Sequence, residues 1–287
     1  MTAQLASPAH VQDGLRQHGY LADAAVGEAV FLADRLGRAI LVEGPAGVGK
    51  TQLAKSVAQL GGRPLFRLQC YEGLDEAKAL YEWDYRKQLL RLQAGNNQRQ
   101  STWSQAHDEL FDEQFLLARP LLQALQSPVP SVLLIDEVDR VEAETEALFF
   151  EVLAENQATI PELGTIVGRH RPQIFLTSNG TRELSEALKR RCLFLHIGYP
   201  DAEAEAAIIR QHLPDMSAAL SSHVARVLAA LRKLDLGKPP SVAEGIDWAR
   251  SLQLLEIDDV AGNLARGLPV LLKSRSDIDA ALAASIG

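Results

Sequence analysis

Eight consecutive residues near residue 50 have the composition of a loop that binds phosphate groups. The run is Gly44, Pro45, Ala46, Gly47, Val48, Gly49, Lys50 and Thr51. Its glycines let successive backbone N–H groups point at one oxyanion, and a helix starting near Lys50 adds the positive end of its dipole. An ammonium at Lys50 suits β- and γ-phosphates, and a hydroxyl at Thr51 suits Mg²⁺. We call this run the P-loop, and it predicts a site for ATP with Mg²⁺.

A carboxylate pair follows a second apolar run. Val132–Ile135 reads as a buried strand, and Asp136 and Glu137 come directly after it. Opposite a P-loop, such a pair has two distinct tasks: Asp136 is expected to hold Mg²⁺ together with Thr51, and Glu137 to orient and polarise an attacking water. The pair therefore predicts hydrolysis of the bound nucleotide. A solvated loop start is the alternative for an acidic pair without a P-loop.

Two further polar groups stand at the ends of predicted elements. Asn179 ends the predicted strand Ile174–Thr177, where ligand-binding groups of open α/β sheets gather, and its amide can bond a γ-phosphate or the water. A turn-forming Asn before Gly is the alternative. Arg190 and Arg191 close a helix, where basic residues commonly cap carbonyl groups. They also suit an arginine finger that enters a neighbouring subunit's site, with Arg191 preferred and Arg190 as the substitute.

The elements that must position these groups form an alternating pattern. A strand at Ala39–Glu43 leads into the P-loop, a helix continues to about Leu60, and Pro64–Gln69 reads as the next strand. Strand, loop, helix and strand make a βαβ unit, which predicts a parallel, doubly wound sheet. The remaining central strands are expected at Val132–Ile135, Ile174–Thr177 and Leu193–Ile197.

Two segments exceed this minimal core. Residues from about 83 to 118 form a segment too long for a plain loop and predict an insertion. Around its start, Tyr81, Trp83 and Tyr85 alternate along an expected strand. Residues 157–168 predict a β-hairpin with its turn at Gly164. We therefore expect an α/β nucleotide-binding domain over residues 1–200 and a small all-helical lid domain over residues 201–287.

The composition of the chain disfavours some classes of protein. The 287 residues are 47% hydrophobic and 23% charged, with a formal net charge of -8. That acidic balance disfavours a general nucleic-acid binder, so no direct nucleic-acid partner is expected. No apolar run reaches the ~20 residues of a membrane span, and no leader is evident at the N-terminus. The two cysteines, Cys70 and Cys192, are expected as buried thiols, and the protein as cytoplasmic.

Together these motifs resemble the AAA+ superfamily of P-loop NTPases. In that resemblance Asp136 and Glu137 correspond to the Walker B pair, Asn179 to sensor 1, and the two segments to the helix-2 and pre-sensor-1 hairpin insertions. Within it, the chain is similar to MoxR-type ATPases, and most similar to the CoxD-like accessory ATPase of carbon monoxide dehydrogenase maturation. The motifs that carry this finer resemblance are Gln69–Asp75, Tyr81–Trp83, Thr159–Thr165, Ala187–Cys192, Pro240–Glu244 and Ile246–Ala249.

The resemblance implies a homo-hexameric ring that remodels a client metalloenzyme, with a von Willebrand factor A-type partner. For the CoxD-like branch it implies a client with a molybdenum–copper active site, as in CO dehydrogenase-type hydroxylases. Two alternatives stay open: a nucleotide-switched assembly scaffold with little hydrolysis, and a DNA-remodelling AAA+ relative. One departure from the family concerns the sensor-2 arginine of the lid, since the helix starting near Pro240 has none at its start and Arg250 comes two to three turns later.

Overall fold

The computed structural model describes residues 5–95, 109–257 and 264–284, and the chain divides into two compact units. We name them the sheet unit and the helical unit. The sheet unit contains Met1–His18, Ala22–Val42 and Ala54–Leu195; the helical unit contains Gly19–Leu21, Glu43–Leu53 and His196–Gly287. The P-loop thus groups with the helical residues, whereas the expected domain boundary at residue 200 assigned it to the sheet. That boundary stays a prediction.

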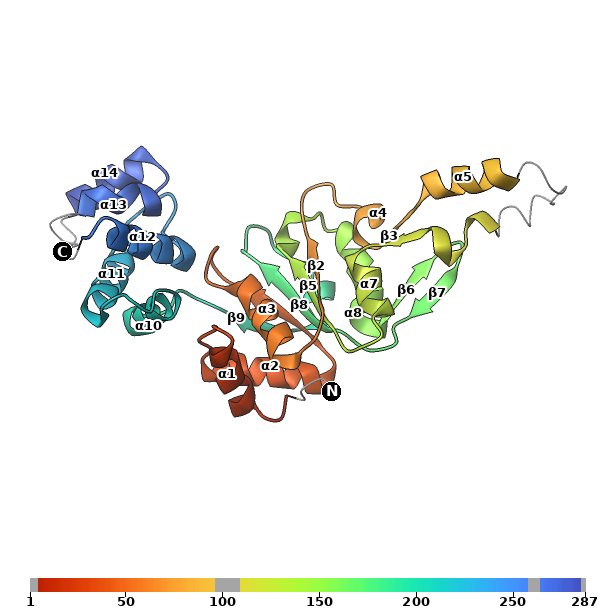
Figure 1. Cartoon of the computed structure of the whole chain (residues 1–287), viewed down its shortest axis with the longest axis horizontal. Helices are drawn as coiled ribbons and strands as arrows, with labels where there is room; N and C mark the ends of the chain where they lie inside the picture. The colour runs from red at the N-terminus through yellow and green to blue at the C-terminus, as the bar shows by residue number, and fades with distance from the viewer. Residues whose placement is uncertain (1–4, 96–108, 258–263, 285–287) are drawn as a thin grey trace. The chain divides into compact units, whose positions relative to one another are not determined.

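A parallel five-stranded sheet forms the α/β core (Figure 1). In spatial order its strands are β2 (Leu65–Gln69), β5 (Val132–Asp136), β8 (Gln173–Ser178), β1 (Ala39–Glu43) and β9 (Cys192–His196). The chain order reverses at β1, because β2 lies on one side of it and β9 on the other. The α/β class and the parallel sheet of a P-loop NTPase are confirmed, with each predicted strand placed to within about one residue.

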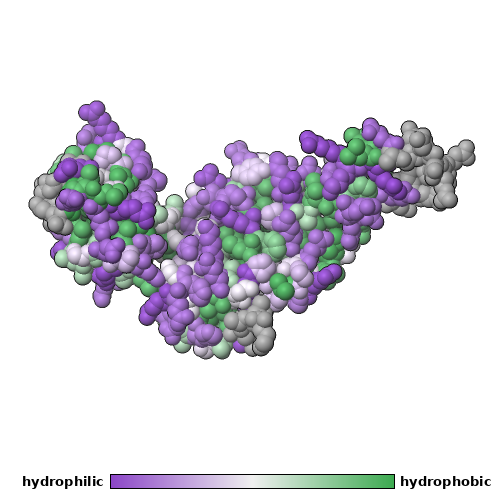
Figure 2. All heavy atoms as spheres, in the orientation of Figure 1, coloured by the Kyte–Doolittle hydropathy of each residue, from purple (hydrophilic) through white to green (hydrophobic). Residues whose placement is uncertain are grey.

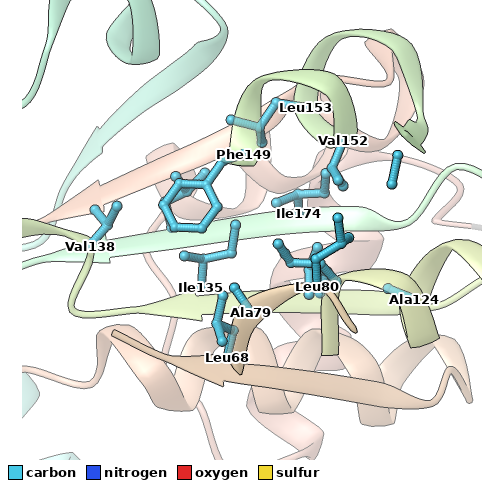
Figure 3. Packing of buried hydrophobic residues seen from close by; sticks show 14 of the residues in the cluster. Leu68, Ala79, Leu80, Ala124, Ile135, Val138, Phe149, Val152, Leu153 and Ile174 are labelled. Atoms are coloured by element: carbon cyan, nitrogen blue, oxygen red, sulfur yellow. The ribbon is translucent and has the colours of Figure 1, made fainter. Parts of the chain in front are cut away.

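The central strands are apolar because both faces of the sheet are buried there: every residue of β5 and β8 is buried. In β5, Leu133 and Ile135 belong to a large hydrophobic cluster on one face, while Val132 and Leu134, which are also fully buried, alternate toward the other. Figure 3 shows this cluster, in which Ile135 lies with side chains from β2, β8 and the helices above them. Near-continuous Val, Leu and Ile is the pattern typical of a parallel strand covered twice.

Helices connect and cover these strands. In the sheet unit they include α1 (Pro8–Gln17), α2 (Ala24–Leu36), α3 (Lys50–Gly61), α7 (Pro120–Gln126), α8 (Phe150–Glu155) and α9 (Glu186–Lys189), of which α3 starts in the helical unit. Side-chain caps at Ser7, Asp23 and Ser185 begin α1, α2 and α9, each accepting a backbone N–H of the first turn. Apolar residues of α7 and α8 belong to the same cluster as Ile135. None of the helices in the described ranges is long and apolar enough to cross a membrane.

The insertion forms a small two-stranded sheet with a projecting helix. It contains α4 (Glu76–Ala79), β3 (Tyr81–Trp83), α5 (Tyr85–Gly95), the 3₁₀ turn Glu113–Phe115 and β4 (Leu116–Ala118), with β3 and β4 antiparallel. Trp83 is buried and packs edge-on against Phe111, with 5.0 Å between ring centroids. Residues 96–108, which include most of the polar part of the predicted insertion, lie outside the described residues.

One sequence expectation within the insertion is wrong. Tyr85 does not alternate with Tyr81 and Trp83 along a strand, because the strand ends at Trp83 and Tyr85 begins α5. The side chain of Asp84 accepts the N–H of Lys87 at 3.1 Å and so caps this helix. Figure 2 shows hydrophobic residues at the surface over α5, where Leu89, Leu90 and Leu92 are exposed.

The predicted hairpin is confirmed. It pairs β6 (Gln157–Ile160) with β7 (Gly164–Val167) in antiparallel register, with Ile160 opposite Gly164. Gly164 has a φ of 78°, the left-handed conformation that a tight turn needs and that glycine adopts without strain. The inward side chains Ala158 and Ile160 join the hydrophobic cluster of the sheet unit.

The helical unit has its own core. Its helices are α10 (Ala202–His212), α11 (Ala218–Leu231), α12 (Val242–Leu254), α13 (Leu264–Leu271) and α14 (Arg275–Ala283), as the helical periodicity predicts. Their apolar faces meet around the fully buried Trp248. A buried ion pair crosses this core: both terminal nitrogens of Arg232 donate to the carboxylate oxygens of Glu205 at 2.7 Å, and the guanidinium stacks 4.2 Å from the Tyr199 ring.

Removing one charge of this pair should destabilise the helical unit strongly. Because the side chains of Glu205 and Arg232 are 0% and 8% exposed, Glu205→Leu leaves an uncompensated guanidinium in the core. We expect the free energy of unfolding, measured by urea titration of the circular dichroism signal, to fall by about 3–5 kcal/mol. Glu203→Leu, on the exposed side of α10, is the matched control. A loss below about 1 kcal/mol for Glu205→Leu would contradict the structural importance of the pair.

Candidate functional site

The P-loop follows β1 and contains two glycines, Gly44 and Gly47, at which a side chain has no room. The N–H of Ile197 donates to the carbonyl of Glu43 at 2.8 Å, which brings the chain after β9 against the start of the loop. A Cβ on Gly44 would lie 1.9 Å from the carbonyl oxygen of Ile197. A Cβ on Gly47, whose φ is +75°, would lie 2.3 Å from the Cβ of Ser241. Close backbone approach therefore requires both glycines.

Lys50 lies at the start of α3 and turns back over the loop. Its side chain is buried, and its ammonium donates to the carbonyls of Gly44 and Pro45, both at 2.7 Å. These bonds hold a positive charge at the mouth of the loop, where the N-terminus of a 12-residue helix adds its dipole. Thr51, one residue into α3, is half-buried. The arrangement fits the triphosphate-binding role expected for Lys50.

The lid helix α12 reaches the P-loop with a serine rather than an arginine. Ser241 caps α12 by accepting the N–H of Glu244, while the carboxylate of Glu244 accepts the N–H of Ser241. This capped end is the part of the lid that lies against Gly47. Arg250 is an exposed residue on the last turns of α12. The structure thus places a helix N-terminus at the position where the family resemblance led us to look for a sensor-2 arginine.

Asp136 ends β5 as a nearly buried carboxylate with both oxygens engaged. The Thr177 hydroxyl donates to Oδ1 at 2.6 Å, and Arg67 donates to Oδ2 through Nε at 3.0 Å and a terminal nitrogen at 2.6 Å. Arg67 comes from the neighbouring strand β2 and is half-exposed. A carboxylate held in this way keeps one fixed orientation, which is compatible with the Mg²⁺-binding role expected for Asp136.

Glu137 follows in a conformation that is uncommon for a residue with a side chain. Its φ and ψ are 57° and 50°, a left-handed geometry that is held because the N–H of Glu137 donates to the Thr177 hydroxyl at 2.8 Å. The Thr177 hydroxyl therefore accepts from Glu137 and donates to Asp136 at the same time. The carboxylate of Glu137 pairs with Arg140, 3.0 Å away on the 3₁₀ turn Val138–Arg140.

Asn179 lies one residue beyond β8, in the loop that faces this turn. Its backbone N–H donates to Oδ2 of Asp139 at 3.1 Å. The same oxygen accepts the N–H of Thr181 at 3.0 Å and its hydroxyl at 2.6 Å. Burial acts to raise the pKa of Asp139, but these hydrogen bonds outweigh it and hold the pKa below its ordinary value.

The pKa of the buried thiol Cys70 is affected by the negative charges at this end of β5. Burial is the larger cause that raises the pKa of Cys70 to about 12, and the charges of Asp136, Asp139 and Glu137 raise it further. The backbone N–H of Cys70 also donates to the carbonyl of Asp136 at 2.8 Å, which continues the pairing of β2 with β5. Cys192 is a second buried free thiol, as expected from the sequence.

The two candidate finger arginines differ in their surroundings. The guanidinium of Arg191 donates to the carbonyl of Ala187 at 2.7 Å and lies 4.6 Å from the Phe150 ring of the same chain. Arg190 is exposed. The short helix α9 before them is anchored by the fully buried Glu146, which accepts from Arg182 at 2.6 Å and from the Ser185 backbone at 3.2 Å.

The structure brings the predicted site residues into three groups. Gly44–Thr51 form the loop after β1. Asp136, Glu137 and Asn179 are joined through Thr177 and Asp139 at the carboxyl ends of β5 and β8. Arg190 and Arg191 lie between α9 and β9. Their roles in a common reaction stay predictions.

Sequence reasoning missed several residues that hold these groups. They are Arg67, Asp139, Thr177, Thr181 and Ser241. Two signals were readable: a charged residue inside the predicted strand Pro64–Gln69, and a third acidic residue two positions after Glu137. Ser241 also has a local signal, the Ser-x-x-Glu spacing of a capping box with Glu244, although its position against Gly47 does not follow from it. Thr177 and Thr181 have no local signal, because their partners are distant along the chain.

Both thiols should be inert in the folded protein. With a pKa of about 12, roughly one thiol in 10⁴ is ionised at pH 8, compared with about a quarter of an unperturbed cysteine. We therefore expect reaction with a disulfide reagent at pH 8 to be at least ~100-fold slower than for free cysteine, and both thiols to react at once in denaturant. Fast labelling of Cys70 in the folded protein would be inconsistent with its buried, acidic surroundings.

Comparison with known proteins identifies the family of the chain. An uncharacterized protein of Staphylococcus epidermidis is 24% identical over 234 residues, which are 79% of this chain and 79% of the relative. An uncharacterized protein of Staphylococcus saprophyticus is 26% identical over 183 residues, 62% of each chain. The family described as "AAA domain (dynein-related subfamily)" matches residues 39–192, more than half of the chain, from β1 to the start of β9. The chain belongs to this dynein-related subfamily of AAA domains.

Proposed function

We propose that this protein hydrolyses ATP in a Mg²⁺-dependent reaction. The observation that carries the proposal is the buried Lys50 ammonium, held at the mouth of a glycine loop that follows the strand where the sheet order reverses. Open α/β sheets bind ligands beyond the carboxyl ends of their strands at such a reversal. The donor set fits the ligand: backbone amides and an ammonium suit phosphate, and a hydroxyl and a carboxylate suit Mg²⁺.

Each of the predicted site residues then has a distinct role in the reaction. The P-loop amides and Lys50 hold the β- and γ-phosphates, and Thr51 with Asp136 hold Mg²⁺. Glu137 orients and polarises the attacking water, and Asn179 bonds the γ-phosphate or that water. ATP with its Mg²⁺ supplies the phosphoanhydride bond and part of the charge neutralisation. The chain's own contribution is therefore orientation and electrostatic stabilisation.

The finer function that we propose is remodelling of a client by a ring, as in MoxR-type ATPases. The motifs shared with the CoxD-like branch support a homo-hexamer acting on a metalloenzyme, with a von Willebrand factor A-type partner and a molybdenum–copper client. The second candidate is a nucleotide-switched scaffold. The ion pair between Glu137 and Arg140 favours it, because a carboxylate so engaged orients water poorly until the pair opens.

Lys50→Ala tests nucleotide binding. The variant removes the ammonium that faces the phosphates, so we expect affinity for a fluorescent ATP analogue in the presence of Mg²⁺ to fall at least ~100-fold. Lys55→Ala, an exposed lysine on the same helix, is the matched control and should bind as the unmodified protein does. Unchanged affinity in Lys50→Ala would show that the P-loop assignment is wrong.

Glu137→Gln separates binding from hydrolysis. The amide keeps the shape of the side chain but cannot take a proton from water, so we expect kcat to fall by about 100-fold or more while ATP affinity changes little. Client maturation measured with the same variant distinguishes the two candidates: a remodeller loses it, and a scaffold keeps it. An unchanged kcat would remove Glu137 from the reaction.

Assembly should control turnover if an arginine enters a neighbour's site. We expect specific ATPase activity to rise with protein concentration, and to fall about 10³-fold in the variant that lacks the finger. Arg190→Ala and Arg191→Ala are compared, because Arg190 is exposed while Arg191 is bound to its own Phe150 and Ala187. Flat specific activity across dissociation, with both variants active, would refute the shared site.

A further inference from the structure

The loop after β8 is fastened to the turn after β5 by a single carboxylate oxygen. Oδ2 of Asp139 accepts three hydrogen bonds, from the N–H of Asn179, the N–H of Thr181 and the hydroxyl of Thr181. Hydrogen bonds to a carboxylate are about twice as strong as those between neutral groups. One side chain therefore sets the path of the residues around Asn179.

Burial of the Asp139 carboxylate costs free energy, and its bonds to the loop offset that cost. Asp139 is 4% exposed, and its Oδ1 has no hydrogen-bond partner within the part of the chain that the structure describes. A buried carboxylate oxygen without a partner carries a desolvation penalty. Besides its own backbone N–H, the groups in the described residues that the Asp139 carboxylate bonds belong to Asn179 and Thr181, so ordering of that loop offsets the penalty.

A second set of hydrogen bonds joins the same two segments of the chain. The Thr177 hydroxyl joins β8 to Asp136 and to the backbone of Glu137. Two hydrogen-bonded links therefore connect the segment 136–139 to the segment 177–181: one is at Thr177, and the other is at Asn179 and Thr181. With both in place, Asn179 cannot shift relative to Asp136 and Glu137 without breaking charge-assisted bonds.

We propose that Asp139 is a positioning residue that fixes Asn179 relative to Glu137 for ATP hydrolysis. This inference rests on the proposed function, because it gives Asn179 a task in that reaction. Asp139 itself touches neither the nucleotide nor the water; it acts through the loop. Removing it should lower turnover while leaving nucleotide binding by the P-loop intact, since its bonds reach no P-loop residue.

The first measurement needs no catalysis. Hydrogen exchange of the peptide that contains Asn179 and Thr181 is compared between the unmodified protein and Asp139→Asn, both without nucleotide. The amide side chain loses the charge, so protection of these two N–H groups should fall about tenfold or more. Unchanged exchange would overturn the positioning role, whatever the protein hydrolyses.

The second measurement is a double-mutant cycle on ATPase activity. Asp139→Asn should lower kcat about tenfold with little change in KM, and should lower it no further in an Asn179→Ala background, because both changes remove the same contribution. Fully additive losses would overturn the proposal. Asp277→Asn is the matched control: this buried carboxylate accepts the N–H groups of Gly237 and Lys238 in the helical unit, so kcat should stay within about twofold.

Thr181→Val is a milder second variant, which keeps the proposal testable if Asp139→Asn does not fold. It removes one of the three donors and keeps the other two, so a smaller decrease in both protection and kcat is expected; no decrease in either would count against the proposal. The cycle also separates this inference from the proposed function. If the unmodified protein hydrolyses no ATP while Asp139→Asn still loses protection, the proposed function fails and the positioning contact stands.

Discussion

The end of β5 gathers more negative charge than a buried strand end can hold without compensation. Asp136, Glu137 and Asp139 lie within four residues, and their charges contribute to the raised pKa of the neighbouring Cys70. Like charges at this spacing repel strongly where water is scarce. Compensation comes from Arg67 on β2, from Arg140 on the following turn, and from N–H and O–H donors of the segment after β8. The rest of the site takes its shape from these partners.

The strands β5 and β8, which end at these charged groups and their donors, are buried along their whole length. Hydrogen bonds to a carboxylate hold a fixed geometry only if the groups around them cannot move, and interiors packed at crystal-like density supply that rigidity. Leu133, Ile135 and Phe149 in the cluster beneath β5 are 0% exposed. The packed sheet thus acts as the rigid base on which Thr177 and Asp139 orient the predicted catalytic groups.

The helical unit also contains a buried charge that is compensated by its neighbours. Its buried charge, Arg232, is paired with Glu205, stacked on Tyr199 and bonded through Nε to the carbonyl of Pro240 at 2.9 Å. Pro240 directly precedes Ser241, the residue that lies against Gly47 of the P-loop. The paired Arg232 therefore also holds Pro240, next to the N-terminus of α12. At this end of α12, where the family resemblance led us to look for a sensor-2 arginine, the chain has the N-cap Ser241 and the positive end of the helix dipole.

Local patterns in the amino-acid sequence were enough to predict the features that depend on neighbouring residues. The glycine spacing of the P-loop, the apolar run before Asp136 and the turn at Gly164 are local patterns, and each one was readable because backbone geometry and burial act over a few residues. What the chain alone did not reveal was the order of the strands, with β8 between β5 and β1. That order places Thr177 beside Asp136 and Asp139 beside Asn179, contacts that span about forty residues. These contacts become visible in the folded chain alone, because a hydrogen bond between distant residues depends on the register and packing of the whole sheet.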